Sequence, residues 1–478
     1  MITLLSAITD KQMFVGATVL FMVALLFGFY YDNFIFLGIP FALVALPLAI
    51  KDIRYAYFFL IASIPCSFGL DISMDFPDEF LMLFLSVLTI VWLVFHAKKS
   101  GLKQFATEPM FIIMVLSLVW ILVSCICSEN FLLSIKFLLK KIWYWLPFFI
   151  LPLVLFQERN FIRSTAKSLL FPMIVVVSII LFRQALVGFS FEMIYDPLQP
   201  FFLNHVLYGS MVSVVLPIAI AALLLSRFLS GQWVFSLLAI AVLLFATYVS
   251  YSRAAWLAVI FAVCVFIGIR LKIMQYVMPI LYVLFVSTVL WLGKDNRFLS
   301  YKPVHDKTVM HETLEDHILA TIQGTDISSA ERYYRWIAAL RMSKDHPILG
   351  VGPNNFYDYY KGYVVKSFRT WVSRNPERST THNYFIFLLV EQGYPAMVLY
   401  ALLYFMIFFQ GQKLYHQASK REDKIIIMAA IMVLAVIFIN NFLSELLETD
   451  KIGSLFYLSL AVLLNYRVKQ KKEAMNYE

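Results

Sequence analysis

The sequence predicts an all-α protein, a polytopic membrane bundle of about 12–14 transmembrane helices with one large loop outside the membrane. Hydrophobic residues make up 61% of the 478 residues and charged residues only 14%, which is too apolar for a soluble chain of this length. The apolar stretches have membrane length and lack the alternation of barrel strands, so helices are the expected spanning elements. One polar stretch, 294–382, interrupts them. We therefore expect a single membrane domain, 1–478, with this stretch as an inserted loop.

Fourteen stretches are candidate transmembrane helices. They cover residues 13–30, 33–50, 55–70, 79–96, 109–127, 142–156, 168–186, 207–226, 233–250, 254–269, 273–293, 383–410, 424–443 and 452–466. The first two are separated by very little, and the short sixth can merge with the segment before it, so the sequence leaves the count open. The first stretch has no clear small-residue cleavage site and another span follows it at once, so we do not interpret it as a cleaved signal peptide.

Positive charges in the short connections predict the orientation. If the N-terminus is cytoplasmic, twenty Lys and Arg residues fall on the cytoplasmic side, against five on the other side: Lys136, Lys140, Lys141, Arg253 and Lys451. This bias predicts that both termini are cytoplasmic and that the loop 294–382 lies outside. The net charge of +9 is explained by these orientation signals, so we expect no nucleic-acid partner.

The sequence contains no pattern typical of a metal or nucleotide site. It has no P-loop, no glycine-rich dinucleotide turn and no HExxH motif, and its four cysteines lie in or beside hydrophobic spans without metal-ligand spacing. The early outer loop holds Asp71, Asp75, Asp78 and Glu79, which we interpret as a solvated turn. We expect no metal and no cofactor.

The large loop has predicted structure of its own. The sequence Ser328-Ser329-Ala330-Glu331 is typical of a capping box. The side chains of Tyr333, Trp336, Ile337 and Leu340 follow at helical spacing. They predict an amphipathic helix of about sixteen residues, with these side chains on its apolar face, that ends near Asp345. The glycines and Pro353 in 350–355 predict a turn, in which backbone N–H groups can form an anion-binding nest, although such a pattern is more often only a turn.

Three ionisable residues are candidates for chemistry at the outer face. Arg253 starts the tenth predicted helix, where its guanidinium can pair with a phosphate, or simply extend to the membrane surface. His382 starts the twelfth, where an imidazole can take a proton from a hydroxyl, or be merely solvated. Glu391, nine residues further along the helix, needs a partner or a polar cavity; contact between helices is as good an interpretation as catalysis.

Further basic groups reach the same face. They are Arg183 near the end of the seventh predicted helix, His205 before the eighth, Arg332 and Arg335 inside the loop, and Lys136 and Lys140 in the sequence FLLSIKFLLKKIWYW. The two lysines share one helix face, which predicts an amphipathic segment lying in the outer interface, as a phosphate-binding element or as a simple anchor.

Three sequence blocks in this order resemble the O-antigen ligase and polymerase superfamily of bacterial membrane proteins. The first is YSRAAWLA at residue 251, the second combines ERYYRWIAAL and HPILGVGPNNF inside the loop, and the third is THNYFIFLLVEQGYPAM from residue 381. The resemblance extends from about residue 203 to about residue 408. The first two hundred residues resemble the superfamily only in hydropathy, and fourteen candidate spans exceed the usual number of about twelve in the family.

The resemblance implies a metal-independent, inverting glycosyltransferase. Its donor would be a glycan linked to undecaprenyl diphosphate, used at the periplasmic face of the inner membrane. The acceptor would be the lipid A core sugar for a ligase, another glycan repeat for a polymerase, or a protein. On this chain, the resemblance makes Arg253 a diphosphate ligand, His382 the catalytic candidate and Arg332 a loop contact.

A carrier is the alternative from another class. A lipid-linked glycan flippase or a small-molecule transporter would suit fourteen spans. Transporters, however, often carry paired repeats and place ionisable groups near the middle of the bilayer. Here the polar groups gather at one face beside one loop, which favours transfer chemistry, while the sequence does not separate ligase from polymerase.

Overall fold

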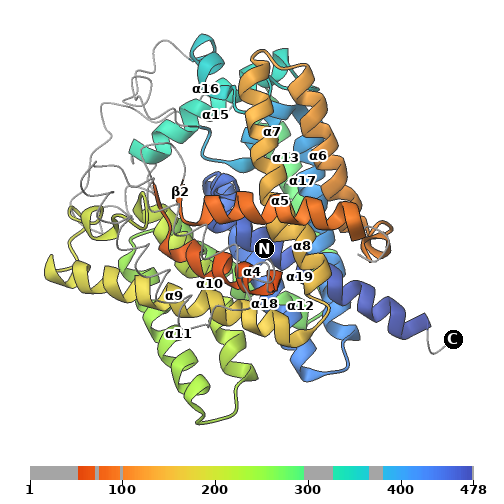
Figure 1. Ribbon diagram of the computed structural model, residues 1–478. Coiled ribbons are helices and arrows are strands. Elements are labelled where there is room, and N and C mark those ends of the chain that lie inside the picture. The colour runs from red at the N-terminus through yellow and green to blue at the C-terminus, as the bar shows by residue number, and fades with distance from the viewer. Residues whose placement is uncertain (1–51, 70–74, 97–100, 295–326, 365–379, 476–478) are drawn as a thin grey trace, which may run out of the picture.

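The computed structural model describes residues 52–69, 75–96, 101–294, 327–364 and 380–475 (Figure 1). Its helices are α4 Ile53–Ser63, α5 Asp78–His96, α6 Pro109–Ile126, α7 Phe131–Trp145, α8 Leu151–Leu155, α9 Arg159–Leu186, α10 His205–Leu225, α11 Gly231–Val249, α12 Arg253–Arg270, α13 Met274–Gly293, α15 Ile327–Asp345, α16 Phe356–Tyr359, α17 Tyr384–Gln417, α18 Arg421–Leu443 and α19 Asp450–Met475. Short helical turns are η2 Ile64–Cys66, η3 Leu102–Phe105, η4 Leu146–Ile150, η5 Asp196–Leu198, η8 Tyr360–Gly362 and η10 Leu446–Glu448. Strands β1 Phe68–Gly69 and β2 Asp75–Phe76 form a small antiparallel pair.

The predicted polytopic all-α class is confirmed. Within the described ranges, nine helical segments are long and apolar enough to cross a membrane. They are Asp78–Phe95, Pro109–Ile126, Phe131–Leu155, Arg159–Leu186, His205–Leu225, Gly231–Val249, Arg253–Arg270, Tyr384–Gln417 and Arg421–Leu443. The helices expected at 13–30 and 33–50 lie outside the described residues.

The segment that carries Lys136 and Lys140 differs from the prediction. We expected it to lie in the outer interface, and the sequence left open whether the short helix at 142–156 merges with it. Instead, α7 continues through the π-helical turn η4 into α8, giving one candidate span, Phe131–Leu155. The prolines at 147 and 152 each fall in the first turn of a new helical segment, where a missing N–H is tolerated and the helix bends without ending.

Helices α10 and α18 form the centre of the bundle. In each, 72% of the most apolar window is buried, against about a third in α5, α6, α11 and α12. A helix that is apolar on every side is stable only when other helices or lipid surround it, and here α9, α11, α12, α17 and α19 surround this pair. The other helices therefore pack around α10 and α18, and this packing fixes where their polar ends lie.

The described part of the large loop packs on α17 where that helix bends. Gly393 has φ 77° and ψ 179°, so the helix is interrupted there, and a Cβ at this residue would lie 1.9 Å from the carbonyl oxygen of Ile348. Glycine is therefore required both for its conformation and for the close approach of the loop. Figure 1 shows α15 and α16 beside the ends of α6 and α7. We call this end of the bundle the loop end.

Helix α15 ends at Asp345 as predicted, but its buried face is rotated from the predicted one. Ile337 is buried as expected, whereas Tyr333, Trp336 and Leu340 are only partly buried. The side chains that pack on the turn after α15 are Ala338, Ala339 and Met342. Small residues allow that turn to come close, which a search for large apolar side chains does not detect. The predicted capping box at 328–331 falls largely on side chains that the structure does not describe.

Candidate functional site

Arg253 begins α12, and a hydrogen-bonded turn holds it there. The Ser252 hydroxyl caps the helix by accepting from the N–H of Ala255 at 3.4 Å. The indole Nε1 of Trp256 donates to the carbonyl of Thr247 at 2.8 Å, which ties the first turn of α12 to the end of α11. The start of the arginine side chain is therefore fixed by its neighbours on both sides of the turn.

The same turn packs closely on α10. A Cβ on Gly209 would lie 2.7 Å from the Cβ of Ser252 and 2.8 Å from the hydroxyl of Ser250, so only glycine fits at this contact. One residue on, the Ser210 hydroxyl donates to Asn440 Oδ1 of α18 at 3.1 Å. These contacts place the start of α12 at the loop end, where α18 finishes.

His382 lies at the same end, immediately before α17. Its backbone has φ 53°, a left-handed conformation that a non-glycine residue adopts only when its surroundings impose it. The next residue, Asn383, caps α17 by accepting from the N–H of Ile386 at 3.1 Å. The imidazole Nδ1 lies 3.9 Å from Glu445 Oε2, and the side chain is 37% exposed. His382 is thus rigidly placed but accessible.

Glu445, just beyond the end of α18, is the group that holds this segment. Its carboxylate accepts hydrogen bonds from the hydroxyls of Thr380 and Thr381 at 2.5 and 2.7 Å, and from the N–H of Asn383 at 3.1 Å. Burial raises the pKa of Glu445, and these hydrogen bonds oppose that rise. Glu445 was not among the residues predicted from the sequence. The only available signal was a carboxylate directly after an apolar span at the same face.

Two side chains of α15 bind the backbone just before the histidine. Arg335 Nη1 donates to the carbonyl of Thr380 at 2.7 Å, and the indole of Trp336 donates to the carbonyl of Thr381 at 2.8 Å. The predicted loop residue Arg335 is therefore brought to the candidate site. It binds the backbone beside His382, so α15 is tied to the segment that leads into α17.

The electrostatic environment keeps His382 neutral. Burial, Arg335 and Arg332 lower its pKa to about 3, because a cation is disfavoured in a partly dry site beside two guanidinium groups. At neutral pH the imidazole therefore has no charge and can accept a proton.

Glu391 has a structural partner that the sequence did not identify. Its carboxylate accepts from the N–H of Asn354 at 2.6 Å and from the N–H of Phe356 at 3.1 Å, while its own carbonyl accepts from Gly352 N–H at 2.9 Å. The turn 350–355, which we considered as an anion nest, thus directs its N–H groups at a carboxylate of the chain itself. This interaction anchors the loop to α17.

The remaining predicted basic residues are spread over several contacts. Arg183 Nη1 donates to the carbonyl of Gln199, and His205 lies edge-on to the rings of Phe191 and Tyr195. Lys136 is exposed on α7. Lys140 lies 5.6 Å from the ring centre of Tyr144. The roles of Arg183, Lys136 and Lys140 as diphosphate ligands, and of His205 as a donor or acceptor contact, remain predictions.

The acidic residues at the start of α5 and just before it are not the solvated turn that we expected. Asp78 is buried, and Asp75 and Glu79 are partly buried. Burial and Asp450 raise the pKa of Asp75, while Lys451 and Lys140 oppose that rise. The predicted solvated turn is wrong because these side chains are withdrawn from solvent beside Asp450 and Lys451, at the start of α19. Asp71 lies outside the described residues, and among the described ones no group of three His, Cys, Asp or Glu side chains is arranged to hold a metal.

Comparison with known proteins identifies the part of the chain that carries this site. Residues 238–401 match the family model described as O-antigen ligase. The matched stretch contains Arg253, Arg332, Arg335, His382 and Glu391, whereas Glu445 lies beyond it. No curated protein matches the chain. The family match confirms the resemblance to the O-antigen ligase and polymerase superfamily that the three sequence blocks indicated.

Proposed function

From the match to the O-antigen ligase family, we propose that this chain is a membrane glycosyltransferase that moves a glycan from undecaprenyl diphosphate to an acceptor hydroxyl. The preferred reaction is ligation of O-antigen to the lipid A core, at the periplasmic face of the bacterial inner membrane. One observation carries the proposal. An accessible imidazole, His382, lies 3.9 Å from the Glu445 carboxylate, and its segment is bound by Arg335 and Trp336 inside the matched stretch.

The proposed reaction is a single displacement with inversion. The acceptor oxygen attacks the anomeric carbon from the side opposite the diphosphate. The bond from that carbon to the diphosphate oxygen breaks, and the leaving undecaprenyl diphosphate takes the bonding electrons. The acceptor proton passes to His382. Cleavage of the activated donor drives the transfer, so no nucleotide triphosphate and no metal is required in this scheme.

Arginine side chains stabilise the charge that develops on the leaving group. Arg253 at the start of α12 can form two parallel hydrogen bonds to a diphosphate, and Arg183, Lys136 and Lys140 are further candidate ligands at this end. Arg332, Arg335 and His205 would contact the donor or the acceptor, with Glu391 anchoring the loop. Fixed cations in a partly dry site act strongly because they need no rearrangement during the reaction.

Donor binding would also increase the basicity of His382. In the free protein, Arg332 and Arg335 help to lower the pKa of this imidazole. A bound diphosphate neutralises their field, so the pKa rises toward the ordinary value of about 6.5. The base would then become effective only when the donor is present, which protects the site from side reactions with water.

Reconstituted transfer tests the proposal. Purified full-length protein in liposomes is supplied with an undecaprenyl-diphosphate glycan and a lipid A core acceptor, and the product is followed on gels. We expect transfer by the wild type and by His346→Ala, a matched control on the same loop, and almost none by His382→Ala. Transfer at the wild-type rate by His382→Ala would overturn the proposal.

Polymerisation and protein glycosylation are the alternative reactions of the same superfamily. They use the same donor and the same proton transfer, and they differ only in the acceptor. Offering a second lipid-linked repeat, or an acceptor peptide, in place of the lipid A core distinguishes them. Reporter fusions test the proposed orientation: alkaline phosphatase should be active at position 320 and inactive at position 472.

A further inference from the structure

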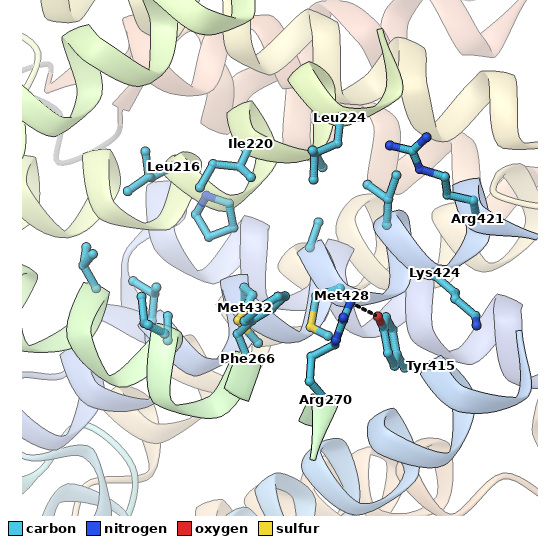
Figure 2. A pocket seen from close by; sticks show the side chains of 18 of the residues that line it. Leu216, Ile220, Leu224, Phe266, Arg270, Tyr415, Arg421, Lys424, Met428 and Met432 are labelled. Atoms are coloured by element: carbon cyan, nitrogen blue, oxygen red, sulfur yellow. Dashed lines mark hydrogen bonds between the residues drawn. The ribbon is translucent and has the colours of Figure 1, made fainter. Parts of the chain in front are cut away.

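A large apolar groove lies at the end of the bundle opposite the loop end. It has a volume of about 930 Å³ and is formed by α10, α12 and α18, with the end of α17 at its rim. Figure 2 shows Leu216 and Ile220 on one wall, Phe266 on another, and Met428 and Met432 between them. This volume is typical of a ligand pocket, and none of the residues assigned to transfer chemistry lines it.

The groove is accessible from the lipid phase. Ile220, Leu224 and Phe266 are each 41–50% exposed although they line it. On α18, the lining runs from Val436 to Lys424, which corresponds to about 18 Å at the helical rise of 1.5 Å per residue. That length is close to the depth of one leaflet, which is about half of a 30 Å hydrocarbon core. An extended acyl chain fits such a groove.

Cations collect at one end of the groove. Arg270 is the last residue of α12, and Arg421 and Lys424 belong to the first turn of α18. Figure 2 shows all three at the same end, with Arg270 Nη1 donating to the Tyr415 hydroxyl at 3.2 Å. A groove that is apolar along its length and basic at its end matches a lipid with an anionic head group.

The neighbouring carboxylates face away from this basic end. Glu422 and Asp423 follow Arg421 directly, but they pair with Arg159, Arg163 and Lys469. In the part of the chain that the structure describes, no carboxylate lies within ion-pair distance of Arg270, Arg421 or Lys424. Arg270 and Arg421 are exposed and Lys424 is half-buried, so these cations are open to an anionic head group at the membrane surface.

The occupant is not the proposed glycan donor. Arg253 and Arg270 are the two ends of α12, a helix of 18 residues, so they lie about 26 Å apart. A diphosphate at the loop end and a phosphate at Arg270 therefore belong to opposite leaflets. We propose that the groove binds an anionic phospholipid of the leaflet opposite the catalytic one, with one acyl chain along α18 and its phosphate between Arg270, Arg421 and Lys424.

Native mass spectrometry of the full chain tests this lipid site. Protein in detergent is titrated with phosphatidylglycerol or with phosphatidylcholine, which has the same tails and no net charge. We expect a preference for phosphatidylglycerol of about tenfold or more, from roughly 1 kcal/mol for each basic residue near the phosphate. The double variant Arg270→Gln/Lys424→Gln should lose that preference. The control Arg227→Gln/Lys272→Gln, with the same charge change at the same end but outside the groove, should keep it.

A second variant tests the apolar part. Ile220→Trp fills the exposed wall without changing charge, and it should release both lipids. An unchanged preference in Arg270→Gln/Lys424→Gln, or undiminished binding in Ile220→Trp, would overturn the site. Disulfide crosslinking of Ile220→Cys to cysteines placed within 13–50, in high yield in native membranes, would also overturn it, because the chain itself would then cover the groove.

Discussion

The two ends of α12 contrast in how tightly they are built. At the Arg253 end, side-chain hydrogen bonds hold the turn, and Gly209 brings α10 into close contact with it. At the Arg270 end, α10, α12 and α18 leave a groove of about 930 Å³ with exposed apolar walls. The same helix thus begins in a close-packed polar site and ends beside an open apolar one.

The contrast follows from what each end is proposed to hold. Bond making requires reacting groups in a fixed geometry, so the surroundings of a base must be rigid. A lipid tail needs only an apolar space. Its anionic head group needs positively charged side chains nearby, but not the two parallel hydrogen bonds that a guanidinium can form. Each prediction below changes one side of this contrast, in order of decreasing expected effect.

The largest effect is expected at His382. His382→Ala should lower the transfer rate by roughly 10²–10⁴-fold, which is the usual contribution of general acid–base catalysis. Binding of the lipid-linked donor should persist, since the histidine acts on the acceptor. Single-turnover transfer and a separate donor-binding titration measure the two quantities. Loss of donor binding in this variant would move His382 from the acceptor to the diphosphate.

Arginine geometry should matter at one end of α12 and not at the other. Arg253→Lys should be impaired by roughly 10²-fold in transfer and Arg253→Ala more, because an ammonium lacks the planar fork that pairs with a diphosphate. Arg270→Lys should keep its preference for phosphatidylglycerol, because there the charge suffices. Protein levels are checked for each variant. If Arg253→Ala transfers glycan at a near-normal rate, then Arg253 is only an interfacial side chain.

The features that could be predicted from the sequence are those whose signal is local. Hydropathy over twenty residues reports the local solvent, so the helical membrane class could be predicted. The blocks around Arg253 and His382 carry their own pattern. Glu445 could not be found in this way, because it lies 62 residues from Asn383 and its role arises only when α18 ends beside α17.

Periodicity was misleading where tertiary contacts decide the outcome. The stretch 131–145 has an amphipathic pattern, but α7 continues into α8 and the pattern reflects burial against neighbouring helices. Lys141 shows the reason: it is buried and pairs with Glu448 at 2.6 Å, so a charge that we counted in an outer connection is an internal ion pair. The acids at the start of α5 and just before it were misjudged likewise, since α19 is distant in the sequence.

A smaller effect is expected from loosening the loop anchor. The Glu391 carboxylate accepts hydrogen bonds from two backbone N–H groups. Glu391→Gln replaces one of its oxygens by an NH2 group, which cannot accept and so leaves one of these N–H groups opposite another donor. We expect a loss of about 1–3 kcal/mol of stability, seen as a lower melting temperature in detergent. Glu129→Gln, with the same charge change on an exposed side chain beside the same turn, should stay within about 0.5 kcal/mol of the wild type. Equal melting temperatures for the two variants would contradict the anchor.

The smallest expected effect is a shift in pH dependence. His382 must be neutral to accept a proton, so transfer is lost as pH falls through its pKa. In the free protein that pKa is about 3, and the acid limb of kcat/KM should therefore lie well below the ordinary histidine range. In the donor complex, the negative charge of the diphosphate offsets the positive charge of the guanidinium groups, so the pKa of His382 rises. The acid limb of kcat should therefore lie at higher pH than that of kcat/KM.

Arg332→Gln should shift the acid limb of kcat/KM. Removing one guanidinium raises the pKa of His382, because that cation is one of the causes that lower it. The acid limb of kcat/KM should move to higher pH in this variant, while that of kcat moves less, since the donor already screens the charge. Lys344→Gln, on the same helix with the same charge change and an exposed side chain, serves as the control. Coincident acid limbs for kcat and kcat/KM in the wild type would show that the donor does not tune the base.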